Sequence, residues 1–391
     1  MIRVMPTPRS VDLEITSRCN ARCKYCYYLN NEGVVYKDLP TSRWLQFFDE
    51  LGRAKVMSVC LAGGEPFIRK DLFELLDGII RNKMRFQILT NGSMVTREIA
   101  RRLRATGRCN SVQVSLDGSC AAVHETMRGK GTFRPALNAI RNLLTEDVPT
   151  TVRVTVHAYN IEDLPAIARL LLEKMGLPSF STNSISAMGT RGKYGDSLFL
   201  TAAQRLRAMK VLAALDEQYP GRIQAAAGPL AEWKGFHEMQ AARASGRPIP
   251  GRGRLVGCGC MFSSLAVRAD GALTPCVALP QMVLGYIGKD SLEDVWRNSP
   301  QLNKFRRRRS IPLKRFRECR GCEYIQSCTG NCAGGALSLL GDANRPSPDA
   351  CLRRFEKELA AEGLSLSLPQ RHRDTENKQE TRNLKPETTK W

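Results

Sequence analysis

A regular alternation of strand-like and helix-like segments in the first half of the chain constrains its fold more than any other feature. Apolar residues recur at helical spacing, as in Leu72, Leu75 and Ile79, and short strand-like runs separate the helical segments. We expect strands at 11–16, 56–61, 85–90, 111–116, 151–157 and 179–186. We expect helices between them at 41–53, 71–82, 96–106, 132–145 and 161–175.

Strands that alternate with helices of ten or more residues form parallel βα units. Six such units occupy the first 190 or so residues, whereas a complete eight-unit barrel needs roughly 250. The predicted fold class is therefore α/β, a partial (β/α)6 TIM-like barrel followed by a cysteine-rich domain. The predicted division is a barrel at 1–200, a helical linker at 201–255, the cysteine-rich domain at 256–363 and a disordered tail at 364–391.

Fourteen cysteines in 391 residues need a chemical explanation. The chain has neither a run of 18 apolar residues nor a secretory signal, so we expect a cytoplasmic protein that does not enter a membrane. Disulfides rarely persist in that compartment, which points to metal or redox chemistry for the thiols. Eight of the cysteines lie within 256–352, and we expect metal rather than a hydrophobic core to organise that segment.

Three cysteines follow the first predicted strand with the spacing C-x3-C-x2-C, at Cys19, Cys23 and Cys26. Three thiolates on one loop can hold three irons of a [4Fe–4S] cube and leave the fourth iron open. An open metal position is typical of a catalytic site rather than a structural one. The alternatives are a zinc site or three unrelated thiols.

The motif, with Tyr25 as its aromatic residue, resembles the signature of the radical S-adenosylmethionine (SAM) superfamily. In that family the open iron is chelated by SAM. Gly63-Gly64-Glu65-Pro66, at the end of the second strand, resembles the family motif that holds the SAM amino group; a simple turn is the alternative. By the same resemblance Asn91, Ser115, Asp117, Arg128, Asn160 and Met188 are expected near SAM.

Two of these residues have simpler explanations. Asp117 followed by glycine can form an ordinary turn. Arg128, which by resemblance reaches the SAM carboxylate, can be a surface cation.

The second group of cysteines resembles the SPASM extension of radical SAM enzymes in every spacing. The resemblance implies two auxiliary [4Fe–4S] clusters, and so three clusters and SAM as cofactors. The implied ligands of the first are Cys258, Cys260, Cys276 and Cys332, and those of the second are Cys319, Cys322, Cys328 and Cys351. A zinc ribbon over 319–332 is the competing interpretation.

Two of these ligands raise a geometric question. Cys258 and Cys260 are one residue apart, and either fits the first position of the pattern. If only one of them binds, the first auxiliary cluster has an open iron that can ligate substrate.

The densest basic run, Arg306–Arg309, accounts for part of the net charge of +21. One interpretation is a solvated helix face near negatively charged clusters. The other is a docking surface for an acidic peptide or protein. Cys60, within the second strand, fits no cluster and is interpreted as a small buried hydrophobic residue.

The resemblance implies reductive cleavage of SAM to a 5′-deoxyadenosyl radical, which abstracts hydrogen from substrate. Peptide or protein maturation is the leading function, with a flavodoxin or ferredoxin as reductant. Because only 18 residues precede Cys19, we expect a separate protein to recognise the leader peptide. The alternatives are a tetrapyrrole-modifying enzyme, a sulfatase-maturing enzyme, and a non-catalytic iron–sulfur or nucleic-acid-binding protein. Val277 counts against the sulfatase-maturing type. Nucleic acid is not the expected partner.

Overall fold

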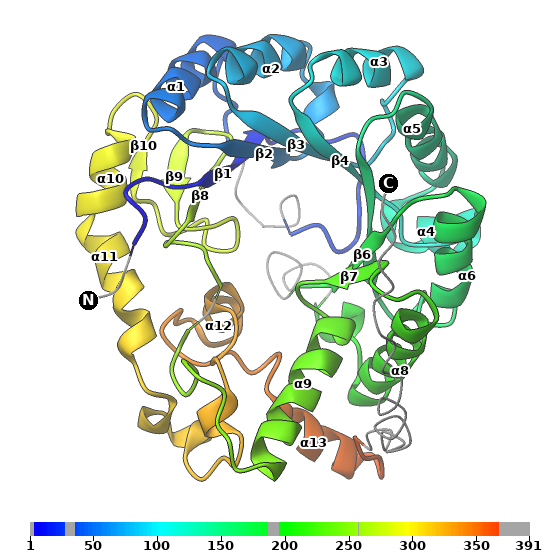
Figure 1. Cartoon of the computed structure of the whole chain (residues 1–391), viewed down its shortest axis with the longest axis vertical. Coiled ribbons are helices and arrows are strands. Elements are labelled where there is room, and N and C mark those ends of the chain that lie inside the picture. Colours follow the sequence, from blue (N-terminus) through cyan, green and yellow to red (C-terminus); the bar gives the residue numbers. More distant parts are fainter. Residues whose placement is uncertain (1–3, 28–35, 187–194, 257, 367–391) are drawn as a thin grey trace, which may run out of the picture.

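A ten-stranded sheet curves as an arc through the molecule, with helices on its convex side (Figure 1). The computed structural model describes residues 4–27, 36–186, 195–256 and 258–366. The strand order is β10-β9-β8-β1-β2-β3-β4-β5-β6-β7, and the six strands expected from the sequence form its consecutive centre. They are β1 (Ser10–Thr16), β2 (Ser58–Gly63), β3 (Arg85–Thr90), β4 (Cys109–Ser115), β5 (Thr150–Val156) and β6 (Phe180–Ser184).

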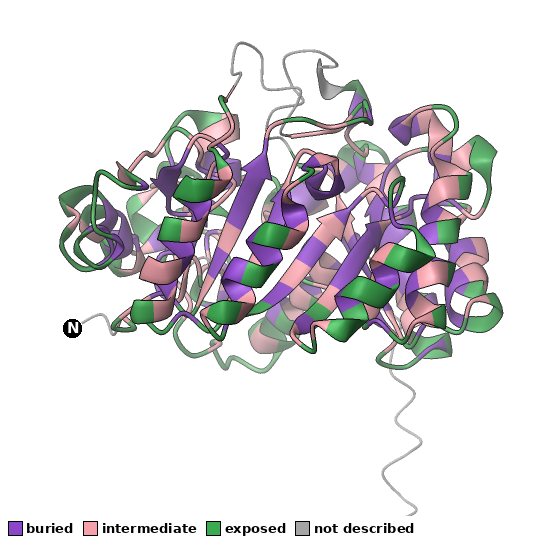
Figure 2. Cartoon of the chain, turned by 90° about the horizontal axis from the view of Figure 1, so that it is seen from above, coloured by how far each residue is buried: buried purple, intermediate pink, exposed green. Residues whose placement is uncertain are grey.

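The helices between these strands also lie where periodicity predicts them. Their exposed faces point away from the sheet, which Figure 2 shows behind them as largely buried. One helix, α4, was not predicted, and α6 continues as a π-helix over Arg169–Lys174. No helix in the described ranges is long and apolar enough to span a membrane. The helices are α1 (Thr41–Arg53), α2 (Leu72–Arg81), α3 (Arg97–Ala105), α4 (Ala121–Arg128), α5 (Phe133–Thr145) and α6 (Leu164–Ala168).

The two faces of the central sheet differ in chemistry. On β1, Val11, Leu13 and Ile15 are fully buried in the main hydrophobic core with the helices. Each contributes about 1.5–3 kcal/mol by leaving water. The alternate residues point to the concave face, because side chains on a strand alternate. Asp12 on β1 is paired in register with Cys60 on β2, and both residues are half-buried. The concave face is therefore more polar and less buried than the face that packs against the helices.

The second half of the chain extends the same sheet at both edges. β7 (Ile223–Ala225) pairs with β6, and β8 (Ser264–Val267) pairs in parallel with β1. β9 (Ala272–Thr274) and β10 (Gly285–Tyr286) then add antiparallel strands. These strands were not predicted because they are two to four residues long, too short for a periodic signal.

The expectation that metal rather than a hydrophobic core organises 256–352 is wrong for the part that follows these strands. Trp296 on α10 (Leu292–Asn298) and Phe305 on α11 (Pro300–Arg306) are buried in the main core beside the sheet. Burying two large aromatic side chains supplies packing energy without metal.

A second hydrophobic cluster joins α8 (Ala202–Gln218) and α9 (Pro229–Ala244) to α13 (Leu352–Ala361). Its centre contains Trp233, Phe236 and Phe355. The segment expected as a linker is thus packed against the end of the cysteine-rich segment. The short helix α12 (Ala333–Leu340) completes this part. The domain boundaries themselves stay predictions, and most of the predicted tail, 367–391, lies outside the described residues.

Candidate functional site

The first cysteine loop starts directly after β1, and Asp38 fixes its starting direction. The Asp38 carboxylate accepts hydrogen bonds from the Thr16 hydroxyl (2.6 Å) and the Ser17 backbone N–H (2.7 Å). Burial alone would raise the pKa of Asp38, but these hydrogen bonds hold it below its usual value. Asp38 therefore stays charged and anchors the loop. The sequence pattern did not indicate this residue, because it lies outside the cysteine motif.

The thiols of Cys19, Cys23 and Cys26 are each half-buried and interact electrostatically. Burial raises the pKa of the Cys23 thiol to about 11, although the Arg128 charge opposes that rise. Within the described ranges, no three His, Cys, Asp or Glu side chains converge tightly enough to hold a single metal ion. A cube binds each thiolate through a different iron, so this looser grouping fits an iron–sulfur cluster.

The Gly63-Gly64 turn lies directly against the cysteine loop. Gly63 has a φ of +116°, and a Cβ atom at Gly64 would lie 1.9 Å from the Arg18 carbonyl oxygen. The Gly64 N–H donates to the Thr16 carbonyl and the Glu65 N–H to the Arg18 carbonyl, both at 2.8 Å. Glycine is needed here because backbone meets backbone. The close approach that these glycines allow is made, in this structure, to the cysteine loop.

Glu65 is almost fully buried and ties the end of β2 to the end of β3. Its carboxylate accepts hydrogen bonds from the Thr90 hydroxyl (2.7 Å) and the Asn91 N–H (2.8 Å). Burial raises the pKa of Glu65, and these hydrogen bonds oppose the rise. The Asn91 side chain in turn lies 3.8 Å from the Cys19 sulfur. Pro66, the next residue, is buried and begins a short 3-10 helix.

Asp117 and Arg128 form a buried ion pair below the cysteine loop. The Arg128 Nε lies 2.5 Å from Asp117 Oδ2, and the Thr155 N–H donates to Asp117 Oδ1 at 2.8 Å. The Tyr25 hydroxyl donates to the same carboxylate. Burial would raise the pKa of Asp117, but the Arg128 charge holds it below its usual value. The surface-cation interpretation of Arg128 is therefore wrong, since only 8% of this residue is exposed.

The remaining residues expected near SAM are placed differently from one another. Asn160 is fully buried, and its amide donates to the carbonyls of Asp117 (2.9 Å) and Thr155 (3.0 Å). Its carbonyl accepts the His157 N–H, so its polar atoms hold backbone together. Ser115 is half-buried at the end of β4. Met188 lies outside the described residues. All these contacts with SAM stay predictions.

The concave face of the sheet carries carboxylates that the sequence pattern did not single out. Glu14 is 3% exposed and lies near Arg268. Burial raises the pKa of Glu14 to about 8, although Arg268 and a hydrogen bond with Tyr27 oppose the rise. Cys60 is half-buried beside Asp12 on this face, so its interpretation as a buried hydrophobic residue is wrong. Alternation along β2 could have indicated this placement.

The distal cysteines gather as two sets, with the membership that the SPASM resemblance implies. In the first, Cys260 interacts with Cys258, Cys276 and Cys332, and its sulfur lies 3.3 Å from that of Cys258. In the second, Cys319 interacts with Cys322, Cys328 and Cys351. No disulfide joins any of the fourteen cysteines, all of which lie in the described part of the chain. Their assignment as cluster ligands stays a prediction.

Two of the four arginines in the basic run are buried, which neither interpretation drawn from the sequence foresaw, whereas Arg307 is exposed and Arg309 is half-buried. Arg306 is 4% exposed and Arg308 is 2% exposed. Arg306 donates to the Met261 carbonyl at 2.8 Å, and Arg308 donates to the Ala343 carbonyl at 2.8 Å. Neither side chain can form a solvated face or a docking surface.

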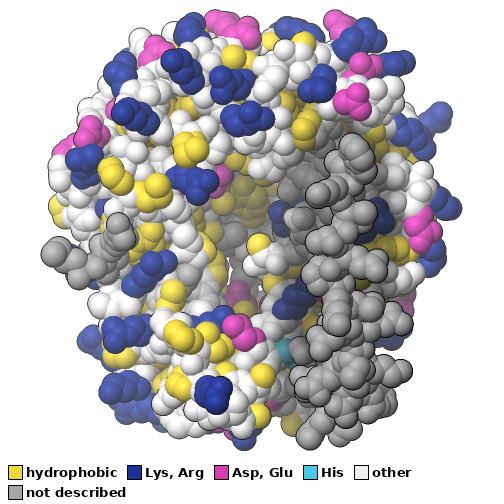
Figure 3. Space-filling model, in the orientation of Figure 1, with side chains coloured by type: hydrophobic (Ala, Val, Ile, Leu, Met, Phe, Trp, Pro, Cys, Tyr) yellow, Lys and Arg dark blue, Asp and Glu magenta, His cyan; other side chains and the backbone are white. Residues whose placement is uncertain are grey.

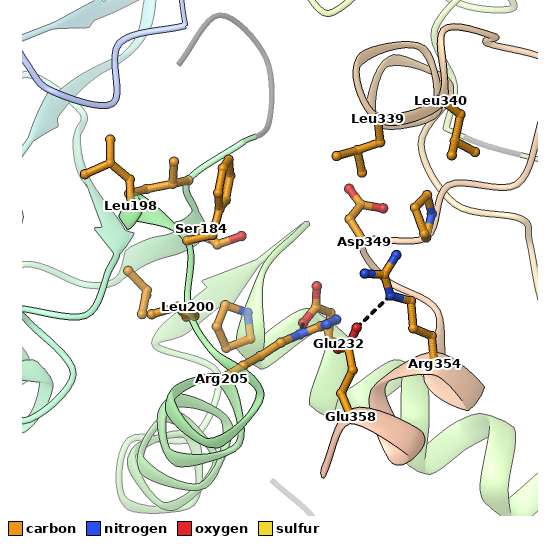
Figure 4. A pocket seen from close by; sticks show the side chains of 15 residues that line it. Ser184, Leu198, Leu200, Arg205, Glu232, Leu339, Leu340, Asp349, Arg354 and Glu358 are labelled. Carbon is orange, nitrogen blue, oxygen red and sulfur yellow. Dashed lines mark hydrogen bonds and ion pairs between the residues drawn. The ribbon is translucent and has the colours of Figure 1, made fainter. Parts of the chain in front are cut away.

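A pocket of about 390 Å³ lies between the edge of the barrel and the cysteine-rich segment (Figure 4). Leucines such as Leu198 and Leu340 form apolar walls. Its polar side holds an Arg205–Glu232 ion pair at 2.6 Å. Burial raises the pKa of Glu232, and the nearby Asp349 carboxylate adds to the rise although Arg205 opposes it. The second pocket ion pair joins Arg354 and Glu358 (2.6 Å). Asp349 also points into the pocket, and among the described residues it has no ion-pair partner.

Two known domains match the chain. The Radical SAM superfamily matches residues 13–171, which span the cysteine loop, the glycine turn and the Asp117–Arg128 pair. The SPASM domain, an iron-sulfur cluster-binding domain, matches residues 258–323. The chain belongs to the radical SAM superfamily. It is an iron–sulfur enzyme that uses a [4Fe–4S] cluster and SAM, with auxiliary clusters in its SPASM domain.

Several curated proteins are similar to this radical SAM chain over almost its whole length. The AdoMet-dependent heme synthase of Methanosarcina barkeri is 28% identical, over 91% of this chain and 100% of that protein. The mycofactocin maturase MftC of Mycobacterium ulcerans is 28% identical, over 90% and 89%. The PqqA peptide cyclase of Ruegeria pomeroyi is 24% identical, over 88% and 87%.

The fold is shared with solved structures. Streptococcus suis SuiB, in a crystal structure with the precursor peptide SuiA, superposes with a TM-score of 0.69. Its sequence is 15% identical, and the match covers 89% of this chain and 77% of SuiB. This likeness confirms the predicted partial barrel with a SPASM domain.

Proposed function

We propose that this radical SAM enzyme modifies a ribosomally made peptide or protein. The observation that carries the proposal is similarity over about nine-tenths of the chain to a peptide cyclase and to a maturase. The pocket between barrel and SPASM segment is a suitable site for a peptide segment, because it combines apolar walls with ion pairs.

Some residues of the site would hold the cofactors, and others fix the position of the cysteine loop. Cys19, Cys23 and Cys26 would hold the cluster that binds SAM. When bound, the cluster and SAM supply a 5′-deoxyadenosyl radical that takes a hydrogen atom from substrate. Glu65 would accept a hydrogen bond from the SAM ammonium group, and its bonds to Thr90 and Asn91 hold it at the ends of β2 and β3. Asp38 keeps that loop in place from the other side.

The similarity to a heme synthase makes tetrapyrrole modification the second candidate. Haem-pathway tetrapyrroles carry several carboxylates and need cationic partners. Both arginines of the pocket are already paired with carboxylates, and Asp349 adds an unpaired negative charge. On the concave face of β1, Asp12 and the largely protonated Glu14 offer no cationic partner for a carboxylate either. This lining favours a peptide with an apolar side chain next to a cationic or hydrogen-bond-donating group.

The charge of the substrate as a whole is a separate matter. Lys and Arg side chains lie all around the rim of the face in Figure 3 rather than in one patch. An acidic substrate, as expected from the net charge of +21, would be attracted to this rim. The segment that enters the pocket would then be apolar with a cationic or hydrogen-bond-donating group, whereas the rest of the substrate would be acidic.

The remaining partners are proposed on chemical grounds. The cluster needs an electron, which a flavodoxin or ferredoxin would deliver. A separate protein would recognise the leader peptide. Fourteen free thiols suit a reducing compartment, so we place the enzyme in the cytoplasm. The sulfatase-maturing type is disfavoured by Val277.

Anaerobic reconstitution with iron, sulfide, SAM and dithionite tests the proposal. We expect 5′-deoxyadenosine and methionine, and their loss in a Cys19→Ala variant that retains the auxiliary clusters. Peptides encoded beside the gene would then be added, with coproporphyrin as the competing substrate. A modified peptide formed together with 5′-deoxyadenosine supports peptide maturation, whereas turnover of the porphyrin alone would overturn it.

A further inference from the structure

Arg308 is a buried cation without a carboxylate partner. It is 2% exposed and donates to the backbone carbonyls of Ala343 (2.8 Å), Arg345 (3.1 Å) and Leu255 (3.5 Å). Among the described residues, no Asp or Glu oxygen forms an ion pair with it. An unpaired charge in the interior is costly, so a counter-charge is expected nearby.

The thiols of the first auxiliary set interact electrostatically with Arg308, and they would carry negative charge as thiolate ligands of a cluster. Burial lowers the pKa of Arg308. The charges of Cys332, Cys260 and Cys258 oppose this decrease, and Asp342 opposes it more weakly. Besides the backbone carbonyls, the groups whose charge favours this cation most are thus predicted cluster ligands.

The backbone contacts lead to the same place. Leu255, whose carbonyl Arg308 binds, lies three residues before Cys258. Ala343 and Arg345 follow α12, and that helix begins directly after Cys332. Arg308 therefore joins the two segments that carry thiols of the first set.

The neighbouring arginines hold the same loop. Arg309 donates to the Val256 carbonyl at 3.4 Å, and Arg306 donates to the Met261 carbonyl at 2.8 Å. Together they bind backbone on both sides of Cys258 and Cys260.

We propose that Arg308 is the counter-ion of the first auxiliary iron–sulfur cluster and raises its reduction potential. This inference rests on the radical SAM assignment and on the proposed ligands, but not on the identity of the substrate. A thiolate-bound oxidised cube carries about −1 to −2, depending on whether three or four thiolates bind it, and reduction adds one more negative charge. A fixed cation in a low-dielectric interior stabilises the reduced state more than the oxidised one.

The test compares Arg308→Gln and Arg308→Lys in the reconstituted holoenzyme, by potentiometric titration followed by EPR. We expect Arg308→Gln to move one of three midpoint potentials to a more negative value and to leave the other two unchanged. Arg308→Lys keeps the positive charge, so it should leave that midpoint potential close to the wild-type value. In a Cys276→Ala background, which should lack the first auxiliary cluster, Arg308→Gln should change nothing.

Arg306→Gln is the matched control. Arg306 lies in the same run, is similarly buried and also binds backbone carbonyls, at Met261 and Trp296, but it contacts only one of the two thiol-bearing segments and its guanidinium lies over the Trp296 ring. Its replacement should leave all three potentials unchanged.

Three outcomes decide the matter. Loss of one cluster in Arg308→Gln but not in Arg308→Lys supports the counter-ion role, because charge is then what the cluster needs. Unchanged potentials in a fully loaded Arg308→Gln would overturn it. Loss of the cluster in both variants would overturn it as well, because the guanidinium would then act only as a backbone clamp. None of these readouts needs a peptide, so failure of the proposed function is recognised separately.

Discussion

The hydroxyl of Tyr25 donates a hydrogen bond to the carboxylate of Asp117, which lies 92 residues later in the chain. Tyr25 stands between the second and third cysteines of the loop, whereas Asp117 follows β4 and is paired with Arg128. The aromatic residue of the cysteine motif thus anchors the loop to the opposite part of the barrel. The buried ion pair gives that anchor a fixed position.

Tyr25→Phe should loosen the cysteine loop without unfolding the barrel. A hydrogen bond to a charged acceptor contributes about 1.5–3 kcal/mol, and Asp117 keeps Arg128 and Thr155 as partners. We expect the variant to lose about four irons per chain to a chelator faster than the wild type does. The control is Tyr159→Phe, because Tyr159 is 62% exposed. Equal rates of iron loss in the two variants would show that the Tyr25 hydroxyl is not an anchor.

Glu14 should make the stability of the protein depend on pH above the range where most carboxylates titrate. The pKa of Glu14 is raised to about 8 in the folded state, against about 4.3 in an unfolded chain. Between these values the folded state holds a proton that the unfolded state has released, so stability falls as pH rises.

Denaturant unfolding of the apoprotein at pH 6 and pH 8 measures this effect. We expect the wild type to lose about 2 kcal/mol relative to Glu14→Gln over that interval. Glu293→Gln is the control, because its side chain is 60% exposed. Parallel pH profiles for the wild type and Glu14→Gln would contradict the prediction.

The barrel could be predicted from the sequence because its signals are local. Alternating strands such as β1 bury Val11, Leu13 and Ile15 on one face, and the helices repeat at 3.6 residues. The cysteine sets were equally accessible, because the resemblance to the SPASM extension rests on spacings along the chain. Hydrophobic periodicity and cysteine spacing can both be recognised without knowing which other segments pack against these residues.

The features that could not be predicted, such as the burial of Arg308, depend on contacts between segments that are distant in the sequence. Nothing near Arg308 in the sequence separates a buried guanidinium from a solvated one, because its carbonyl partners lie at Leu255 and Ala343. Strands as short as β10 carry no period and form only because β9 is beside them. Asp38 is likewise recognised only once its hydrogen bonds with Thr16 and Ser17 are seen.

Asp349→Lys tests whether the acidic side of the pocket selects the substrate. The change reverses the only carboxylate of the described pocket lining that lacks an ion pair. For a peptide with a cationic or hydrogen-bond-donating group, we expect KM to rise about tenfold, equivalent to about 1.4 kcal/mol. SAM cleavage without peptide should be unchanged. Glu293→Lys on α10, across the molecule from α13 in Figure 1, is the control. A lower KM in Asp349→Lys would instead indicate an anionic substrate group.

Cys258 and Cys260 should differ in what their removal does to the first auxiliary cluster. Cys260 is half-buried and interacts with Cys276 and Cys332, whereas Cys258 is exposed and interacts chiefly with Cys260. Their sulfurs, 3.3 Å apart, are too close to bind two corners of one cube unless one of them moves.

We therefore expect Cys260→Ala to lose about four of about twelve irons per chain, and Cys258→Ala to retain nearly all of them. Iron and sulfide analysis of both reconstituted variants checks this. Full retention in Cys258→Ala leaves the cube with three protein ligands and an iron open to substrate. Addition of substrate should then change the EPR signal of that cluster. Loss of four irons in Cys258→Ala as well would mean that the two thiols separate and that both are ligands.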